Sequence, residues 1–264
     1  MFTIDKYILA ESLDQAYELN QSRRNAIIGG MLWLKMGRKK IGTAIDLSSL
    51  GLNLIEEDDE NFRIGSMCTL RQLELHEGLN SNFNNLFSDA LGHIVGVQMR
   101  NLATVGGSIF SRFGFSDLLT ALMSLDCSVE LFKKGIVSLE EYAIMPYDKD
   151  IVVRIIIKKD GRKTSCMSQR MSSSDFPVLV CAVSKNGNFW KASMGGRPGK
   201  AVLKTFELGD NPSAEEIDKA VSKAVSETPF GSNMRGSSRY RQLLAHVLIK
   251  RNIGSIIRGG QHAD

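Results

Sequence analysis

The chain has 264 residues, of which 43% are hydrophobic and 23% charged, and its formal net charge is +4. This length suits two or three small domains, and the mild charge without a continuous basic stripe argues against nucleic-acid binding. No apolar run approaches the roughly 20 residues that span a bilayer, so a membrane protein is excluded and we expect a soluble, cytoplasmic one. The four cysteines show no Cys-x-x-Cys spacing, which predicts that this chain alone holds no metal.

The first 55 residues alternate between helical and strand patterns, which predicts a small α/β unit. The predicted elements are a helix that Ser12 and Gln15 cap, a buried strand at 26–28, a short helix at 32–36 and a strand at 43–47.

Residues 56–162 are predicted to form a second α/β subdomain. Its acidic stretch 56–60 suits the tip of a hairpin, and residues 151–157 have the strongest strand pattern in the chain. The other predicted elements are a strand at 62–65, a helix that Thr69 and Gln72 cap, a helical stripe over 86–97, a helix at Asp117 that Ser116 caps, and a strand at 128–132.

Residues 163–264 have a different character, which predicts an α+β domain. Two strands, 178–184 and 189–194, are predicted to form a hairpin through Asn186-Gly187. A helix follows the capping box of Ser213 and Glu216, and a last helix is predicted to end near Gly254. We expect residues 259–264 to be a loose tail.

Two pairs of adjacent glycines, Gly29-Gly30 and Gly106-Gly107, are the candidate ligand-binding feature. Each is predicted to follow a strand and to form a turn in which the backbone comes very close to a ligand. Thr104 and Ser108 place a hydroxyl on either side of the second pair. Two such loops can converge on one anion.

Other phosphate and catalytic motifs are excluded. Gly-x-Gly never occurs, so no Rossmann fingerprint is present, and the Gly199-Lys200 pair lacks the remaining residues of a P-loop. There is no Gly-x-Ser-x-Gly motif, and His76, His93 and His246 are expected to be ordinary residues of helices. No catalytic side chain is therefore predicted.

Several segments, taken in chain order, carry a resemblance to one known family. They are Ile27-Ile28-Gly29-Gly30-Met31-Leu32, residues 64–69, Gln98 to Ile109 around Thr104-Val105-Gly106-Gly107-Ser108, Ser116-Asp117-Leu118, and residues 151–157, 169–176 and 237–241. The set resembles the FAD-binding (medium) subunit of the molybdenum hydroxylases, which include xanthine dehydrogenase and carbon monoxide dehydrogenase.

The resemblance implies an α+β fold of the p-cresol methylhydroxylase type. Two α/β subdomains, residues 1–55 and 56–162, would hold FAD, and residues 163–264 would form a C-terminal α+β domain. Amides of the two glycine loops would bind the pyrophosphate, Asp117 would approach the FAD ribose or ring system, and Val152 would line the flavin. The implied cofactor-binding residues are Ile27, Ile28, Gly29, Gly30, Met31, Leu32, Thr104, Val105, Gly106, Gly107, Ser108, Asp117 and Val152.

The resemblance also implies an oxidoreductase function and its partners. A molybdenum-cofactor catalytic subunit would oxidise a substrate, a two-iron iron–sulfur subunit would relay the electrons, and FAD in this chain would pass them to NAD or another acceptor. The chain departs from the family at Met31-Leu32, at Ser108 and at a missing lysine before Arg170. Two alternatives stay open: a flavin-free scaffold or assembly paralogue, and a self-sufficient flavin oxidase.

Overall fold

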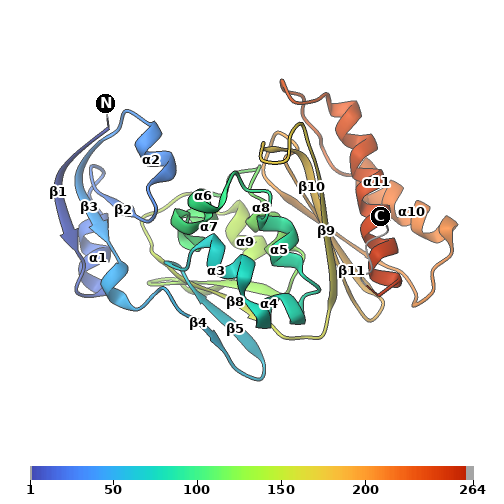
Figure 1. The fold of residues 1–264 in the computed structure, drawn as a ribbon, viewed down its shortest axis with the longest axis horizontal. Helices are drawn as coiled ribbons and strands as arrows, with labels where there is room; N and C mark the ends of the chain where they lie inside the picture. The colour runs from blue at the N-terminus through green and yellow to red at the C-terminus, as the bar shows by residue number, and fades with distance from the viewer. Residues whose placement is uncertain (1, 260–264) are drawn as a thin grey trace. The chain divides into compact units, whose positions relative to one another are not determined.

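The computed structural model describes residues 2–259 (Figure 1). The chain divides into two compact units. The first unit comprises residues up to 72 together with 97–111 and 127–157, and the second comprises 73–96, 112–126 and the residues from 158 onward. Residues 260–264 of the tail expected at 259–264 lie outside the described residues. The three-part division at residues 55 and 162 stays a prediction.

The first unit begins with a three-stranded parallel sheet in the order β1-β3-β2. Helix α1 begins as predicted, because the Ser12 Oγ accepts the N–H of Gln15 at 3.1 Å. One core contains Ile45 and Ala16, and another contains Ile28, Ile41 and Ala44. The elements are β1 (Thr3–Leu9), α1 (Leu13–Asn20), β2 (Ala26–Ile28), α2 (Leu32–Met36), β3 (Lys40–Asp46) and the 3-10 turn η1 (Ser48–Leu50).

A five-stranded sheet in the order β4-β5-β8-β6-β7 forms the rest of the first unit. The acidic stretch is the β4–β5 hairpin, as predicted, with its turn at 58–60. The strong strand at 151–157 is β8, which pairs with β6 in antiparallel fashion. The elements are β4 (Ile55–Glu57), β5 (Asn61–Gly65), α6 (Val97–Leu102), α7 (Val105–Ser111), β6 (Cys127–Leu131), β7 (Gly135–Ser138), α9 (Leu139–Ile144) and β8 (Val152–Lys158), and α3 (Leu70–Leu75) begins in this unit.

The second unit is built on a four-stranded antiparallel sheet in the order β12-β11-β10-β9. The predicted hairpin is confirmed: Asn186 pairs with Phe189, and Gly187 has the positive φ of 56° that a tight turn requires. The elements are α4 (Glu77–Asn82), α5 (Leu86–Leu91), α8 (Asp117–Met123), β9 (Lys163–Arg170), β10 (Pro177–Asn186), β11 (Phe189–Gly195), β12 (Val202–Glu207), α10 (Ala214–Ser226) and α11 (Ser238–Ile257).

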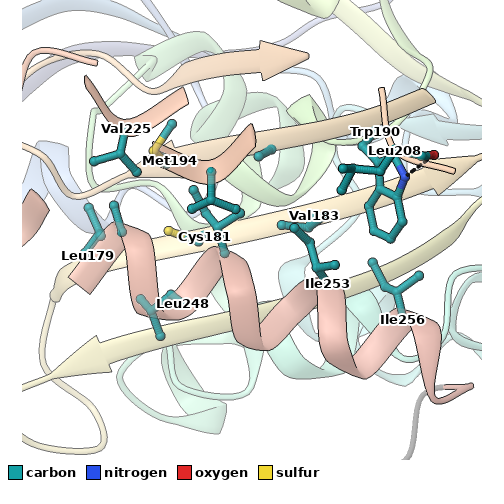
Figure 2. Packing of buried hydrophobic residues seen from close by; sticks show 14 residues of the cluster. Leu179, Cys181, Val183, Trp190, Met194, Leu208, Val225, Leu248, Ile253 and Ile256 are labelled. Carbon is teal, nitrogen blue, oxygen red and sulfur yellow. Dashed lines mark hydrogen bonds between the residues drawn. The ribbon is translucent and has the colours of Figure 1, made fainter. Parts of the chain in front are cut away.

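Helix α11 packs one face on this sheet and closes the core of the second unit (Figure 2). Leu248 and Ile253 of the helix and Cys181 and Val183 of β10 belong to the same buried cluster. The indole of Trp190 is buried at one end of the cluster, and its Nε1 donates to the Leu208 carbonyl at 3.3 Å. Burial of this apolar surface is the main source of stability in the unit.

Some predicted helices have different limits in the structure. The stripe over 86–97 is two helices, because α5 ends at Leu91 and α6 begins only at Val97. Helix α11 continues through Gly254 to Ile257 rather than ending near the glycine. His76 precedes α4 and caps it, its Nδ1 accepting the Leu79 N–H at 3.1 Å. Within residues 2–259, no helix is both long and apolar enough to cross a membrane.

Candidate functional site

The first glycine loop connects β2 to α2 in the first unit. Ile28 ends the strand and its side chain is buried, which fixes where the loop begins. Met31 then adopts a left-handed conformation, with φ 56° and ψ 15°, immediately before the helical residue Leu32. A left-handed residue followed by a right-handed one turns successive N–H groups toward the same side, which is the geometry of an anion-binding nest. Within residues 2–259, the N–H groups of Gly30 and Met31 have no acceptor in the protein.

The first loop lies directly against the residues that precede α7. A Cβ on Gly30 would come within 1.8 Å of the Leu102 carbonyl oxygen, and one on Gly29 within 2.5 Å of the Thr104 Oγ1. Only residues without a Cβ can approach another backbone segment so closely. The glycine pair therefore lets the first loop pack against the segment that leads into the second glycine pair.

The second glycine pair was predicted to form a turn after a strand, and this prediction is wrong. The pair lies inside helix α7. Thr104 caps this helix, and its Oγ1 accepts the N–H of Gly107 at 3.2 Å. Two amides expected to face a ligand are bonded within the protein. Val105 donates to the Cys68 carbonyl at 2.8 Å, and Gly106 donates to the Ser66 carbonyl at 2.7 Å.

The two glycines of the second pair have opposite surroundings. Gly106 is buried, and a Cβ there would lie 2.7 Å from the Cβ of Ser66. Gly107 is exposed, and among the described residues a Cβ there would meet only the Thr104 Oγ1, at 3.1 Å. Ser108, the next residue, is half-buried. The open side of α7 is therefore at Gly107 and Ser108.

Ser66 places an unsatisfied hydroxyl behind this helix. Its side chain is 3% exposed, and its Oγ has no hydrogen-bond partner within residues 2–259. Because a buried polar group without a partner costs about 1–3 kcal/mol, we expect Ser66→Ala to raise the free energy of unfolding by about 1 kcal/mol. Urea unfolding of the two proteins measures this change. An equal or lower stability of the variant would show that Oγ has a partner in solution.

Val152 lies in β8 of the same unit, with 6% of its surface exposed. The carbonyl of the next residue, Val153, accepts the N–H of Ser66 at 2.9 Å. Because the carbonyl of Ser66 accepts from Gly106, backbone hydrogen bonds connect β8 through Ser66 to α7. The first unit thus contains all the predicted cofactor-binding residues except Asp117.

Asp117 belongs to the second unit, where it begins helix α8. The Ser116 Oγ caps this helix by accepting the Leu119 N–H at 3.1 Å, as predicted. The carboxylate is buried and pairs with the Arg170 guanidinium, with Oδ1 and Nη2 2.5 Å apart. Burial raises the pKa of Asp117 to about 6, although the neighbouring Arg170 favours the charged form.

Arg170 lies at the centre of a polar network that, apart from Asp117, was not among the predicted site residues. Its Nη1 donates to the Asp175 carbonyl at 2.7 Å, and the Asp175 carboxylate in turn pairs with Arg235 at 3.0 Å. The Arg235 guanidinium lies over the ring of Phe176, 5.1 Å from its centre. In the sequence, this network was indicated by Gln169-Arg170 and Asp175-Phe176, which are part of the family resemblance.

Comparison with known proteins shows which family this chain belongs to. The model of the FAD binding domain in molybdopterin dehydrogenase matches residues 2–159, and the chain therefore belongs to this family. The resemblance found in the sequence is confirmed. This chain is an FAD-binding subunit of the molybdenum hydroxylase type of dehydrogenase, and its cofactor is FAD.

Individual relatives extend the match over nearly the whole chain. The uncharacterised protein YgfM of Escherichia coli (strain K12) is 25% identical over 98% of this chain and 99% of its own length. The glyceraldehyde dehydrogenase medium chain of Sulfolobus acidocaldarius is 24% identical over 92% of this chain and 94% of its own. A crystal structure of cyanide-inactivated Cu,Mo-CO dehydrogenase has a similar fold, with a TM-score of 0.86 at 19% identity over 97% of this chain and 98% of that one. The predicted fold class is confirmed.

Proposed function

We propose that this chain is the electron-transfer subunit of a heteromeric molybdenum-containing dehydrogenase. In this proposal, a molybdenum-cofactor subunit oxidises the substrate, a two-iron iron–sulfur subunit relays the electrons, and FAD in this chain delivers them to NAD or another acceptor. Family membership supports the proposal, and so does the similarity to a dehydrogenase medium chain along almost the full length. The isoalloxazine ring supplies the redox chemistry, while the protein binds and orients the cofactor.

The FAD pyrophosphate is proposed to bind where the first loop meets α7. The observation that supports this proposal is the close approach of Gly30 to Leu102, which brings the first loop against the residues that precede α7 and leaves the left-handed Met31 next to this contact in the chain. The N–H groups of Gly30 and Met31, which have no acceptor within residues 2–259, would donate to one side of the diphosphate. The Ser108 hydroxyl would contact the other side, and the exposed Gly107, whose N–H donates to the Thr104 Oγ1, would leave room for the diphosphate because it has no side chain.

The remaining predicted residues have supporting roles in this proposal. Ile27, Ile28, Thr104, Val105 and Gly106 would hold the two backbone segments in place, because their described contacts are with the protein. Leu32 would do so as the first residue of α2, directly after Met31. Val152 would line the flavin, and Asp117 would approach the ribose or ring system. These last two assignments rest on the resemblance.

Gly107→Val tests the pyrophosphate site without disturbing much of the protein. The space around Gly107 is open except for one hydroxyl, so the variant is expected to fold. Its side chain would occupy the side from which the phosphate approaches, and FAD binding is expected to weaken at least about 100-fold, or about 3 kcal/mol. Flavin fluorescence titration measures the affinity. Gly209→Val is the control, because no atom of residues 2–259 outside its immediate chain neighbours lies within 4 Å of a Cβ at Gly209.

Electron transfer is tested with the assembled complex. Its substrate, added without an electron acceptor, is expected to bleach the oxidised flavin band, and NAD or an artificial acceptor is expected to restore it. If the artificial acceptor restores the oxidised flavin band and NAD does not, NAD is not the electron acceptor of this subunit. A flavin that stays oxidised while the iron–sulfur clusters become reduced would contradict the proposed route.

A further inference from the structure

The outward face of helix α11 in the second unit is more apolar than a surface helix requires. The inward face of α11 packs on the sheet through residues such as Leu248 and Ile253 (Figure 2). On the opposite side, Tyr240, Leu243 and Val247 are 42%, 61% and 42% exposed. A helix that is apolar on both faces is normally buried on both.

The exposed apolar residues continue into a line of cationic ones. Residues 240, 243, 247, 251, 254 and 258 recur every three or four positions, so they lie along one side of the helix. We call these six residues the α11 stripe. Arg251 and Arg258 are exposed, and within residues 2–259 neither makes an ion pair. The stripe therefore has an apolar half and a positively charged half.

The helix carries no acidic residue along its 20 positions. Asp218 of α10 pairs with Lys250 at 2.7 Å, on the flank of α11 rather than in the stripe. Two copies of the stripe in contact would place arginines against arginines or leave them without carboxylates, which disfavours self-association. The charge instead matches a surface of opposite sign.

We propose that the α11 stripe is the docking surface for a partner subunit of the complex whose contact patch is apolar and rimmed by carboxylates. This inference rests on the heteromeric assembly of the proposed function. Leu243 and its apolar neighbours would be buried at the centre of the contact, and Arg251 and Arg258 would pair with acidic groups at its edge. The apolar half of the stripe covers only about two turns of α11. This is a small apolar face compared with that of helices that lie in a lipid surface.

The test uses the full chain, loaded with FAD and produced together with the molybdenum and iron–sulfur subunits. Leu243→Ser combined with Arg251→Glu is expected to weaken assembly at least about tenfold, because it removes a central apolar contact and reverses one charge. Size-exclusion chromatography with titrated subunits measures the affinity. The matched control combines Phe189→Ser with Lys219→Glu, which change an exposed apolar and an exposed cationic residue outside the stripe.

Each outcome bears on a different claim. The docking surface is supported if the wild-type complex assembles less tightly as salt rises, the stripe variant loses assembly and the control variant keeps it. Normal assembly of the stripe variant would overturn this inference and leave the proposed function intact. Failure of the FAD-loaded wild-type chain to associate would overturn the proposed assembly itself. Binding of the wild type, but not the stripe variant, to phosphatidylserine vesicles would assign the stripe to a lipid surface instead.

Discussion

Gly30→Ala is expected to abolish FAD binding. A Cβ at this position would lie 1.8 Å from the Leu102 carbonyl oxygen and 2.5 Å from its carbon, and these are backbone atoms that no side-chain rotation can move away. The first loop must then separate from α7, and the Gly30 and Met31 amides leave the position in which both can bind one diphosphate. We expect the purified variant to lack the flavin absorption band and to gain none on incubation with FAD.

The control for this variant is Gly209→Ala, because in the described part of the chain a Cβ at Gly209 would meet no atom within 4 Å apart from its chain neighbours. Circular dichroism shows whether the Gly30→Ala protein is folded. A folded Gly30→Ala protein that binds FAD with wild-type affinity would mean that the contact of the two loops is not part of the cofactor site.

The stability of the second unit is expected to fall as pH rises from about 4 to 7, because of Asp117. Burial raises its pKa from the usual 3.8 to about 6. In this window the folded protein keeps a proton that the unfolded chain has lost, so raising the pH favours unfolding. A shift of about two units corresponds to about 3 kcal/mol, at 1.36 kcal/mol per unit. Urea unfolding at a series of pH values measures the slope.

Asp117→Asn removes the titrating group and is expected to flatten this dependence. It also leaves the Arg170 guanidinium without its carboxylate, so the variant is expected to be less stable than the wild type in absolute terms. Asp58→Asn is the control, because the pKa of Asp58 is lowered to about 2, and its titration lies below the window. An unchanged slope in the Asp117 variant would show that Asp117 is ionised in the folded protein at pH 4.

Local signals predicted the secondary structure well where residues near in sequence determine it. The caps at Ser12, Ser116 and Ser213 and the Asn186-Gly187 turn all form in the structure. These features depend on hydrogen bonds and backbone angles within a few residues, which one sequence displays directly.

The strands at the edges of the sheets were harder to predict. Strand β1 was not predicted because it is exposed along most of its length and shows no clean alternation of buried residues. β9 and β12, the outer strands of the second unit's sheet, were missed as well. Their structure depends on pairing with distant strands, which local pattern does not display.

The backbone conformation at the two glycine pairs was not predicted. The sequence had suggested a turn at the second glycine pair, but these residues form the first turn of helix α7. The N–H groups at the start of this helix donate to distant carbonyls, Val105 to Cys68 and Gly106 to Ser66, and such bonds have no local sequence signal. The left-handed Met31 had no sequence signal either, because methionine rarely adopts this conformation. Its backbone angles are held by the surrounding loop, and such outliers often occur at binding sites.

Binding of FAD between the two glycine segments is tested most directly by the visible spectrum of the protein after reconstitution with the cofactor. The wild-type protein, incubated with FAD and freed of excess cofactor, is expected to retain one flavin per chain, whereas Gly107→Val retains none. A wild-type chain that stays colourless under these conditions would support the flavin-free scaffold alternative and contradict the account. Equal flavin content in wild type and Gly107→Val would contradict the proposed position of the pyrophosphate.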